Sequence, residues 1–175
     1  MNRICLVAAM VLASWTMTAG RALACTQLPT AIQVDDFLAP VVEGLLAASP
    51  TFSRQCDRIA ELPLVRVAVR MLPKGEASCC RARTTIRRYS SGAMIALVEI
   101  PSPRISLEYA ELLGHEFEHI LEQIDLVDLN ALAGQGGATR LGDGAYETTR
   151  ARRAGDAVAE EAIKATESAE RSPLR

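Results

Sequence analysis

Regular alternation of apolar and polar residues marks the middle of the chain. In residues 64–71 the valines fall on one face and two arginines on the other, which predicts a half-buried strand. Residues 81–89 and 93–100, separated by Ser-Ser-Gly, predict a β-hairpin. Because the second of these strands is nearly all apolar, we expect it to be interior or well covered.

Helical spacing of apolar residues is found on both sides of these strands. It predicts helices over residues 35–48 and 50–61, the second with Ser49 as N-cap and Pro50 as its first residue. The most strongly helical segment is 106–124. One side of this helix is apolar, and we expect it to pack on the sheet; it consists of Leu113, Phe117, Ile120, Leu121 and Ile124.

A glycine-rich stretch, with five of the eleven glycines between residues 134 and 144, leads to the last predicted helix. That helix is expected over residues 145–167 with Asp143 as its cap, and 168–175 are expected to form a flexible tail. The order of elements predicts a single α+β domain over residues 25–167. In it, a small, three-stranded, mainly antiparallel sheet packs against helix 106–124 and the carboxyl-terminal helix.

The first 24 residues have the pattern of a secretory signal peptide. Arg3 precedes an apolar run of about 16 residues, shorter than the roughly 20 that a spanning helix needs, and Ala22-Leu23-Ala24 forms a cleavage pattern. We therefore expect export to the periplasm or the medium, with no membrane span after cleavage. A lipoprotein signal would also place Cys25 first, but it prefers Leu where this chain has Ala22, so lipidation is the alternative.

The exported chain would retain four cysteines: Cys25, Cys56, Cys79 and Cys80. An even number of cysteines in an oxidising compartment predicts disulfides. Because the adjacent Cys79 and Cys80 could pair with each other only in a strained ring, we expect one to bond Cys25 and the other Cys56.

Charge argues against a nucleic-acid partner. The chain has 19 basic and 21 acidic residues, and signal cleavage would remove two of the basic ones, leaving a formal charge of −4. Residues 66–88 are rich in arginine, which could recognise an anionic substrate or polymer, although solvated strand faces are the simpler interpretation.

The chain has only two histidines, His115 and His119, and both lie on the predicted helix 106–124. A Glu-x-x-His di-iron bundle is excluded, because Leu112 stands where the second glutamate would be needed. Histidines four residues apart project from one helix face and can bind one Zn²⁺, while Glu116 lies beside the metal as a general base for water. His-Glu-x-x-His on a helix is the pattern of zinc peptidases.

A catalytic zinc needs a third protein ligand, which must be a carboxylate because no third histidine exists. We favour Glu147, expected in the first turn of the last helix and delivered by the glycine-rich stretch. Asp125 is the alternative, although the helix would have to break at Glu122 for Asp125 to reach the metal.

The segment from Glu111 to His119 resembles the active-site helix of the zincin metallopeptidases. The segment Tyr146-Glu147-Thr-Thr-Arg150 resembles the glutamate helix of their gluzincin branch, and both resemble segments of small uncharacterised exported bacterial proteins with an HExxH helix. The resemblance covers about residues 80–160. It implies that His115, His119 and Glu147 bind zinc, that Glu116 is the base, and that strand 93–100 is the edge strand along which an extended peptide pairs.

Two positions depart from the gluzincin pattern. The aspartate that supports a zinc-bound histidine four residues after the ligand glutamate is Ala151 here, and no spare histidine can stabilise an oxyanion. That role falls to Tyr146, to Tyr89 or Tyr109, or to an arginine. The expected function is an exported zinc metallopeptidase acting on a peptide or protein substrate. The alternatives are a non-catalytic zinc-binding envelope or accessory domain, and a structural envelope protein in which the motif is coincidental.

Overall fold

A computed structural model describes residues 27–72, 82–101, 106–142 and 144–171. Within them the helices and strands are, in chain order, β1 (Ile32–Val34), α1 (Ala39–Ala48), α2 (Pro50–Ala60), β2 (Val65–Met71), β3 (Arg83–Arg88), β4 (Met94–Ile100), α3 (Ser106–Ile124), α4 (Leu129–Gly134), β5 (Ala138–Arg140), β6 (Tyr146–Thr148) and α5 (Thr149–Arg171).

The main sheet has four strands in the order β1-β2-β4-β3. β1 and β4 both run parallel to β2, and only β3 pairs antiparallel, with β4. The α+β class and the interior position of β4 are thus confirmed. The prediction of three mainly antiparallel strands is wrong for two reasons. β1 is too short to show alternation, and β4 lies between β2 and β3, so that it pairs parallel with β2.

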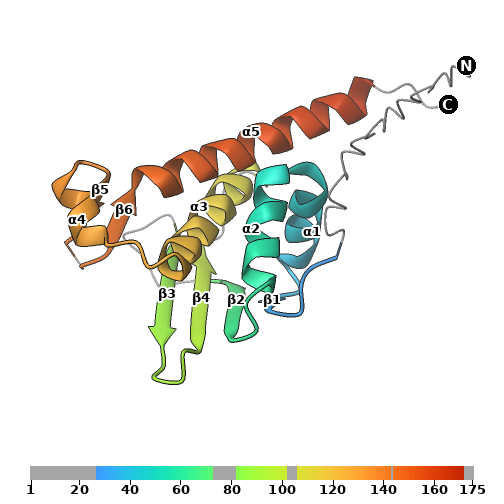
Figure 1. Ribbon diagram of the computed structural model, residues 1–175. Helices are drawn as coiled ribbons and strands as arrows, with labels where there is room; N and C mark the ends of the chain where they lie inside the picture. The colour runs from blue at the N-terminus through green and yellow to red at the C-terminus, as the bar shows by residue number, and fades with distance from the viewer. Residues whose placement is uncertain (1–26, 73–81, 102–105, 143, 172–175) are drawn as a thin grey trace, which may run out of the picture.

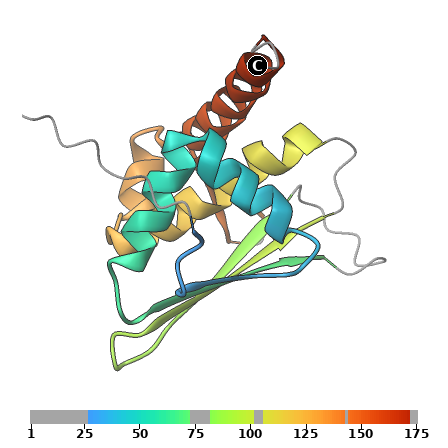
Figure 2. The ribbon, with the colours of Figure 1, turned by 90° about the vertical axis from the view of Figure 1, so that its right-hand side faces the viewer.

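The helices lie on one side of the main sheet (Figures 1 and 2). α3 packs between the sheet and α5, while β5, β6 and α4 form a small lobe at one end of the molecule (Figure 1). The core lies between the sheet and the helices, and the ring centroids of Phe52 on α2 and Phe117 on α3 are 4.9 Å apart within it. The predicted apolar side of α3 is confirmed as part of this core.

α3 and α5 cross at very close range because glycines stand at their contact. A Cβ at Gly155 of α5 would lie 2.7 Å from the Glu111 carbonyl oxygen and 3.2 Å from the Cβ of His115. A Cβ at Gly114 of α3 would lie 2.6 Å from a methyl carbon of Val158. The two histidines of α3 are therefore supported from behind by the amino-terminal half of α5.

Two predicted helices begin later than expected. α1 begins at Ala39, with Pro40 in its first turn, because the preceding residues form β1 and the turn after it. α5 begins at Thr149, because 146–148 form β6 and the hydroxyl of Thr148 accepts the N–H of Ala151 as an N-cap does. α5 also continues to Arg171, so residues 168–171 are helical.

Several sequence predictions lie outside the described residues: the signal peptide, the capping role of Asp143, and the disulfide partners Cys25, Cys79 and Cys80. Cys56 is buried in α2. In the part of the chain that the structure describes, no helix combines the length and apolar character needed to cross a bilayer.

Candidate metal centre

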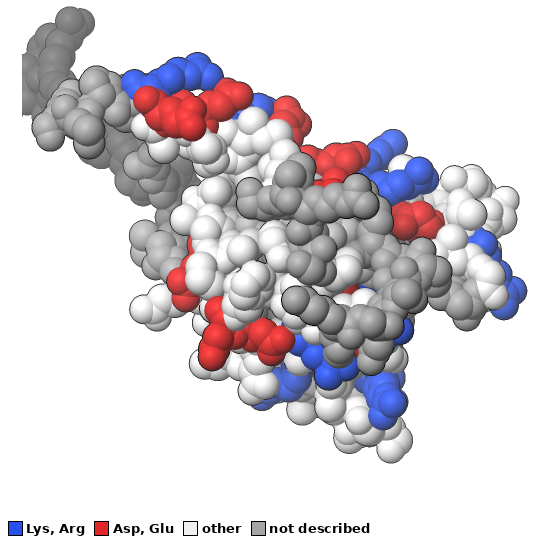
Figure 3. Space-filling view, turned by 180° about the vertical axis from the view of Figure 1, so that it is seen from behind, with Lys and Arg blue, Asp and Glu red and all other residues white. Residues whose placement is uncertain are grey.

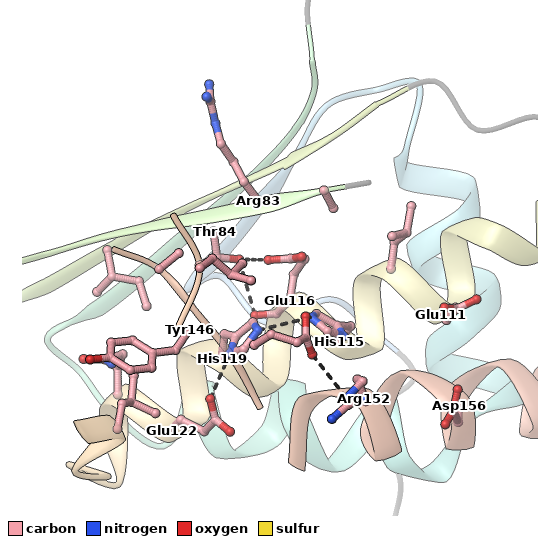
Figure 4. A pocket seen from close by; sticks show the side chains of 18 of the residues that line it. Arg83, Thr84, Glu111, His115, Glu116, His119, Glu122, Tyr146, Arg152 and Asp156 are labelled. Carbon is pink, nitrogen blue, oxygen red and sulfur yellow. Dashed lines mark hydrogen bonds and ion pairs between the residues drawn. The ribbon is translucent and has the colours of Figure 1, made fainter. Parts of the chain in front are cut away.

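α3 places both histidines in a cleft of about 850 Å³ that is bounded by β3, α3, β6 and the start of α5 (Figure 4). One helical turn separates the two side chains, and the Nε2 atoms of His115 and His119 are 3.1 Å apart. Both imidazoles are mostly buried, so their nitrogen atoms meet in a partly water-excluded site.

Glu147 reaches the histidines from β6. Its Oε2 is 3.4 Å from Nε2 of His115, and one ligand atom from each of the three residues lies within 4.8 Å of the others. The prediction that Glu147 belongs to the first turn of the last helix is wrong. Tyr146 and Thr148 favour a strand, and Glu147 pairs with Thr139 across the β5–β6 hairpin.

These three side chains could hold a metal ion, and two of their separations match those of a tetrahedral site. Ligands at about 2.1 Å from a tetrahedral zinc lie about 3.4 Å from one another, close to the 3.1 and 3.4 Å separations found here. The other carboxylate oxygen of Glu147 is buried and has no hydrogen-bond partner among the described residues, with Arg152 Nε 3.7 Å away. A carboxylate with one unsatisfied buried oxygen, beside two facing imidazole nitrogens, is a suitable environment for a cation.

Glu122 orients His119. Its Oε2 is 2.8 Å from Nδ1 of His119, and its other oxygen accepts the hydroxyl of Thr148 at 2.5 Å. The hydrogen bond to a carboxylate places a proton on Nδ1 and leaves the lone pair of Nε2 directed at His115, the tautomer that metal binding requires. Glu122 is fully buried, and it supplies from α3 the support that Ala151 cannot supply from α5.

The two imidazoles differ in their pKa shifts. Burial lowers the pKa of His115, which keeps this side chain neutral and able to bind a cation. Burial is the largest single effect on the pKa of His119 and lowers it, but the hydrogen bond to Glu122 and the charges of the nearby carboxylates together outweigh burial and raise the pKa. Burial is the largest single effect on Glu122 and would raise its pKa, but the hydrogen bonds with His119 and Thr148 and the charges of His119 and Arg150 together lower it.

Glu116 lies between α3 and β3, where its side chain points toward Thr84 at the wall of the cleft (Figure 4). It is 5% exposed, and the hydroxyl of Thr84 on β3 donates to its Oε2 at 2.6 Å. Burial raises the pKa of Glu116, although the hydrogen bond from Thr84 acts in the opposite direction. A carboxylate with a raised pKa accepts a proton more readily, as a general base must.

Of the residues considered for an oxyanion, Tyr146 and three arginines line the cleft, but Arg83 donates to Glu99 and Arg88 to the carbonyl oxygen of Gln123, which leaves Tyr146 and Arg152. The hydroxyl of Tyr146 points away from the histidines and donates to Asn130 of α4 at 2.5 Å (Figure 4). Tyr109 is buried in the core, and Tyr89 follows the end of β3. Arg152, close to Glu147, is therefore the best-placed group for stabilising negative charge beside the candidate ligands.

Asp125, the alternative third ligand, is engaged elsewhere. Its Oδ2 is 2.9 Å from Nη2 of Arg150, and Nε of Arg150 donates to Glu118 at 2.5 Å. Glu118 also bonds Gln55 of α2, so these contacts lie on the side of α3 that faces α2. α3 continues through Glu122 to Ile124 without the break that Asp125 would need.

The edge strand next to the cleft is β3. The prediction that strand 93–100 forms this edge is wrong, because β4 pairs with β2 on one side and β3 on the other. Alternate residues of β3, including Thr84 and Ile86, line the cleft.

Three residues of the site were not identified from the sequence in their observed roles: Thr84, Glu122 and Arg152. Glu122 had a detectable signal, since a residue three positions after a histidine lies on the same helix face. Thr84 contacts Glu116 because β3 packs against α3, and Arg152 of α5 lies near Glu147 because β6 precedes that helix in the cleft. The sequence contains no local signal for either contact.

Comparison with protein-family models, curated proteins and solved structures found no significant match to this chain.

Proposed function

We propose that this protein is an exported zinc-dependent metallopeptidase with a zincin-like scaffold. The observation that carries the proposal is the convergence of His115, His119 and Glu147 from two separate elements, with His115 at 3.1 and 3.4 Å from the other two.

The donor set favours zinc. Two imidazole nitrogens and one carboxylate oxygen are the ligands of many catalytic zinc sites, whereas Mg²⁺ and Ca²⁺ prefer oxygen atoms alone. The carboxylate that orients His119 is a further feature of such sites. Three protein ligands would leave a position open for water or substrate.

A bound zinc ion would lower the pKa of water and polarise a substrate carbonyl. Glu116, on the neighbouring wall of the cleft, is placed to accept a proton at its carboxylate and to return it to the leaving amine. Thr84 orients the Glu116 carboxylate through the 2.6 Å hydrogen bond, and Arg152 supplies positive charge near Glu147.

β3 supports a peptide as the substrate. It is an edge strand beside the site, and an edge strand can pair with an extended peptide through its main-chain N–H and C=O groups. Pairing of this kind would hold the backbone of the substrate along the cleft between β3 and α3.

A non-catalytic zinc-binding domain is the second candidate. It is favoured by the orientation of Tyr146, whose hydroxyl is bonded to Asn130 and not directed at the histidines. The two candidates share the metal ligands and differ in whether Glu116 acts as a base.

Metal analysis and a paired peptide digest test both candidates. We expect about one zinc per chain, lost in His115→Ala and in Glu147→Ala but retained in Glu116→Gln. We expect Glu116→Gln to cleave a peptide library roughly 100- to 10,000-fold more slowly than wild type. Glu167→Gln on the exposed end of α5 is the matched control and should behave as wild type.

Each other outcome identifies a different failure. Equal cleavage by wild type and Glu116→Gln would indicate a contaminating peptidase. Stoichiometric zinc without cleavage by wild type would support the non-catalytic domain. Zinc content unaffected by both ligand substitutions would refute the metal site itself.

A further inference from the structure

The face of the main sheet that points away from the helices has a regular pattern of side chains. The register of β2, β4 and β3 aligns its residues in rows across the three strands. One row is Arg70, Glu99 and Arg83, and another is Arg66, Ile95 and Arg87. Both rows have an arginine on β2 and another on β3, and they differ in the residue on β4 between them.

In the first row both arginines pair with an acidic residue of the protein, and they share a single carboxylate. Glu99 is 2% exposed and accepts from Arg70 at 2.7 Å and from Arg83 at 2.6 Å. The hydrogen bond from Arg83 contributes most to lowering the pKa of this carboxyl, so Glu99 is ionised and pairs with both neighbours.

In the second row the central residue has no charge. Ile95 is 46% exposed, and the arginines on both sides of it are exposed as well. Arg66 donates to the carbonyl oxygens of Pro63 and Val65. Within the ranges that the structure describes, neither Arg66 nor Arg87 lies within ion-pair distance of a carboxylate.

Two more exposed apolar side chains extend this row toward the β3–β4 turn. Leu64, just before β2, is 55% exposed and lies against the turn at Gly92. Tyr89, just after β3, is 48% exposed and donates its N–H to Ala93 across the turn. We call the resulting surface the basic–apolar patch; it consists of Leu64, Arg66, Arg87, Tyr89 and Ile95.

Arginine side chains and apolar surface lie side by side on this part of the molecule. In the view from behind, a group of basic side chains lies with uncharged surface over the lower part of the molecule, where the strands are (Figure 3). A patch with this composition needs a partner that offers both negative charge and an apolar phase.

We propose that the basic–apolar patch docks the protein on the surface of an anionic lipid bilayer. Lipid phosphates compensate Arg66 and Arg87, while Leu64 and Ile95 enter the apolar boundary and Tyr89 lies at the headgroup level, where tyrosine is enriched. An anionic polymer would account for the arginines but not for three exposed apolar side chains beside them. The patch lies on the sheet face opposite α3, so the proposal does not depend on the proposed metal or on peptidase activity.

Vesicle co-sedimentation tests the proposal. Wild-type protein, purified with its own amino-terminal sequence, is mixed with vesicles of phosphatidylcholine and phosphatidylglycerol or with phosphatidylcholine alone. We expect binding to the anionic vesicles, weakened by salt, and little binding to the neutral ones. Arg87→Gln should weaken binding about fivefold, and Arg66→Gln with Arg87→Gln about 30-fold. Ile95→Ser should weaken it as well.

Matched variants on α5, on the other side of the helical layer, separate docking from general effects of charge and hydrophobicity. Arg153→Gln and Ile163→Ser remove an exposed arginine and a 40% exposed isoleucine there and should bind as wild type. Equal binding to neutral and anionic vesicles, or equal losses in the patch and control variants, would overturn the proposal. So would the absence of vesicle binding together with a dimer in sedimentation velocity that Ile95→Ser disrupts, since the face would then be a contact between copies of the chain.

Discussion

At the scale of single residues, the candidate metal centre depends on a second layer of carboxylates as much as on the ligands. Glu122 and Glu116 are both buried on α3, and Glu122 is bonded to His119. Each of the two carboxylates also accepts a hydrogen bond from a hydroxyl on another element. Thr148 of β6 fixes the first and Thr84 of β3 fixes the second. The site is therefore held together by the packing of two strands on α3.

Glu122→Gln should reduce zinc affinity about 10- to 100-fold, because the amide cannot replace the charged acceptor that fixes the tautomer of His119. Competition with a chromogenic chelator measures the affinity. Glu118→Gln is the matched control, since Glu118 is also buried on α3 but bonds Gln55 and Arg150. The control should lower stability and leave zinc affinity close to that of wild type, and an equal loss of affinity in both variants would contradict the role of Glu122.

The residues of the motif could be predicted from the sequence, whereas their partners could not. A helix fixes the relation of His115, Glu116 and His119 through its own geometry, so spacing alone is informative. Glu147 could be named as a ligand because carboxylates were the only remaining type, but its strand was missed. Its pairing with Thr139 joins two three-residue segments, and strands that short have no recognisable period.

At the scale of elements, the crossing of α3 and α5 determines where the histidines lie. Gly114 of α3 and Gly155 of α5 stand at the two closest approaches between these helices, and neither position has room for a Cβ. Side-chain hydrogen bonds reinforce the crossing, because Arg150 of α5 bonds Glu118 of α3.

Gly155→Ala should lower the free energy of unfolding by about 1–3 kcal/mol, because the added methyl meets a backbone carbonyl oxygen at 2.7 Å. It should also weaken zinc binding, since the same methyl lies 3.2 Å from the Cβ of His115. Gly44→Ala is the comparison. This exposed glycine within α1 has no atom within 4 Å of an added Cβ, so the substitution should raise stability by up to about 1 kcal/mol. Urea denaturation measures both, and a stabilising Gly155→Ala would contradict the close crossing.

At the scale of the whole molecule, the carboxyl-terminal helix closes the fold onto the amino-terminal helices. Glu161 of α5 accepts the Ser49 hydroxyl at 2.5 Å, the Thr51 N–H at 2.9 Å and the Thr51 hydroxyl at 2.8 Å. These contacts join residues more than 100 positions apart in the chain and also satisfy the first turn of α2.

Glu161→Gln should lower the free energy of unfolding by about 1–2 kcal/mol near pH 7, through the loss of charged hydrogen bonds. The hydrogen bonds from Ser49 and Thr51 outweigh partial burial and hold the pKa of Glu161 below its ordinary value of 4.5. A carboxyl with a lowered folded-state pKa adds stability above its unfolded pKa and loses that contribution as the pH falls through the folded pKa.

The difference between wild type and Glu161→Gln should therefore be full near pH 7 and shrink below about pH 4.5. Urea denaturation at several pH values measures it. Glu160→Gln, the neighbouring residue on the exposed side of α5, is the control and should show no resolvable change. A difference for Glu161→Gln that stays constant down to about pH 3 would mean that its charge does not contribute.

The position of Glu147 on the β5–β6 hairpin also affects how the centre would release its ion. The hairpin and α4 have little buried surface: α4 has no buried residue, and in the two strands only Ala138 and Thr148 are buried. Segments with so few buried contacts open locally at a lower free-energy cost than the core, and their amide hydrogens exchange sooner. Opening of the hairpin removes one ligand while α3 and the sheet stay folded. If the centre binds zinc as proposed, the lifetime of the ion would follow the opening rate of this hairpin and not the unfolding rate of the domain.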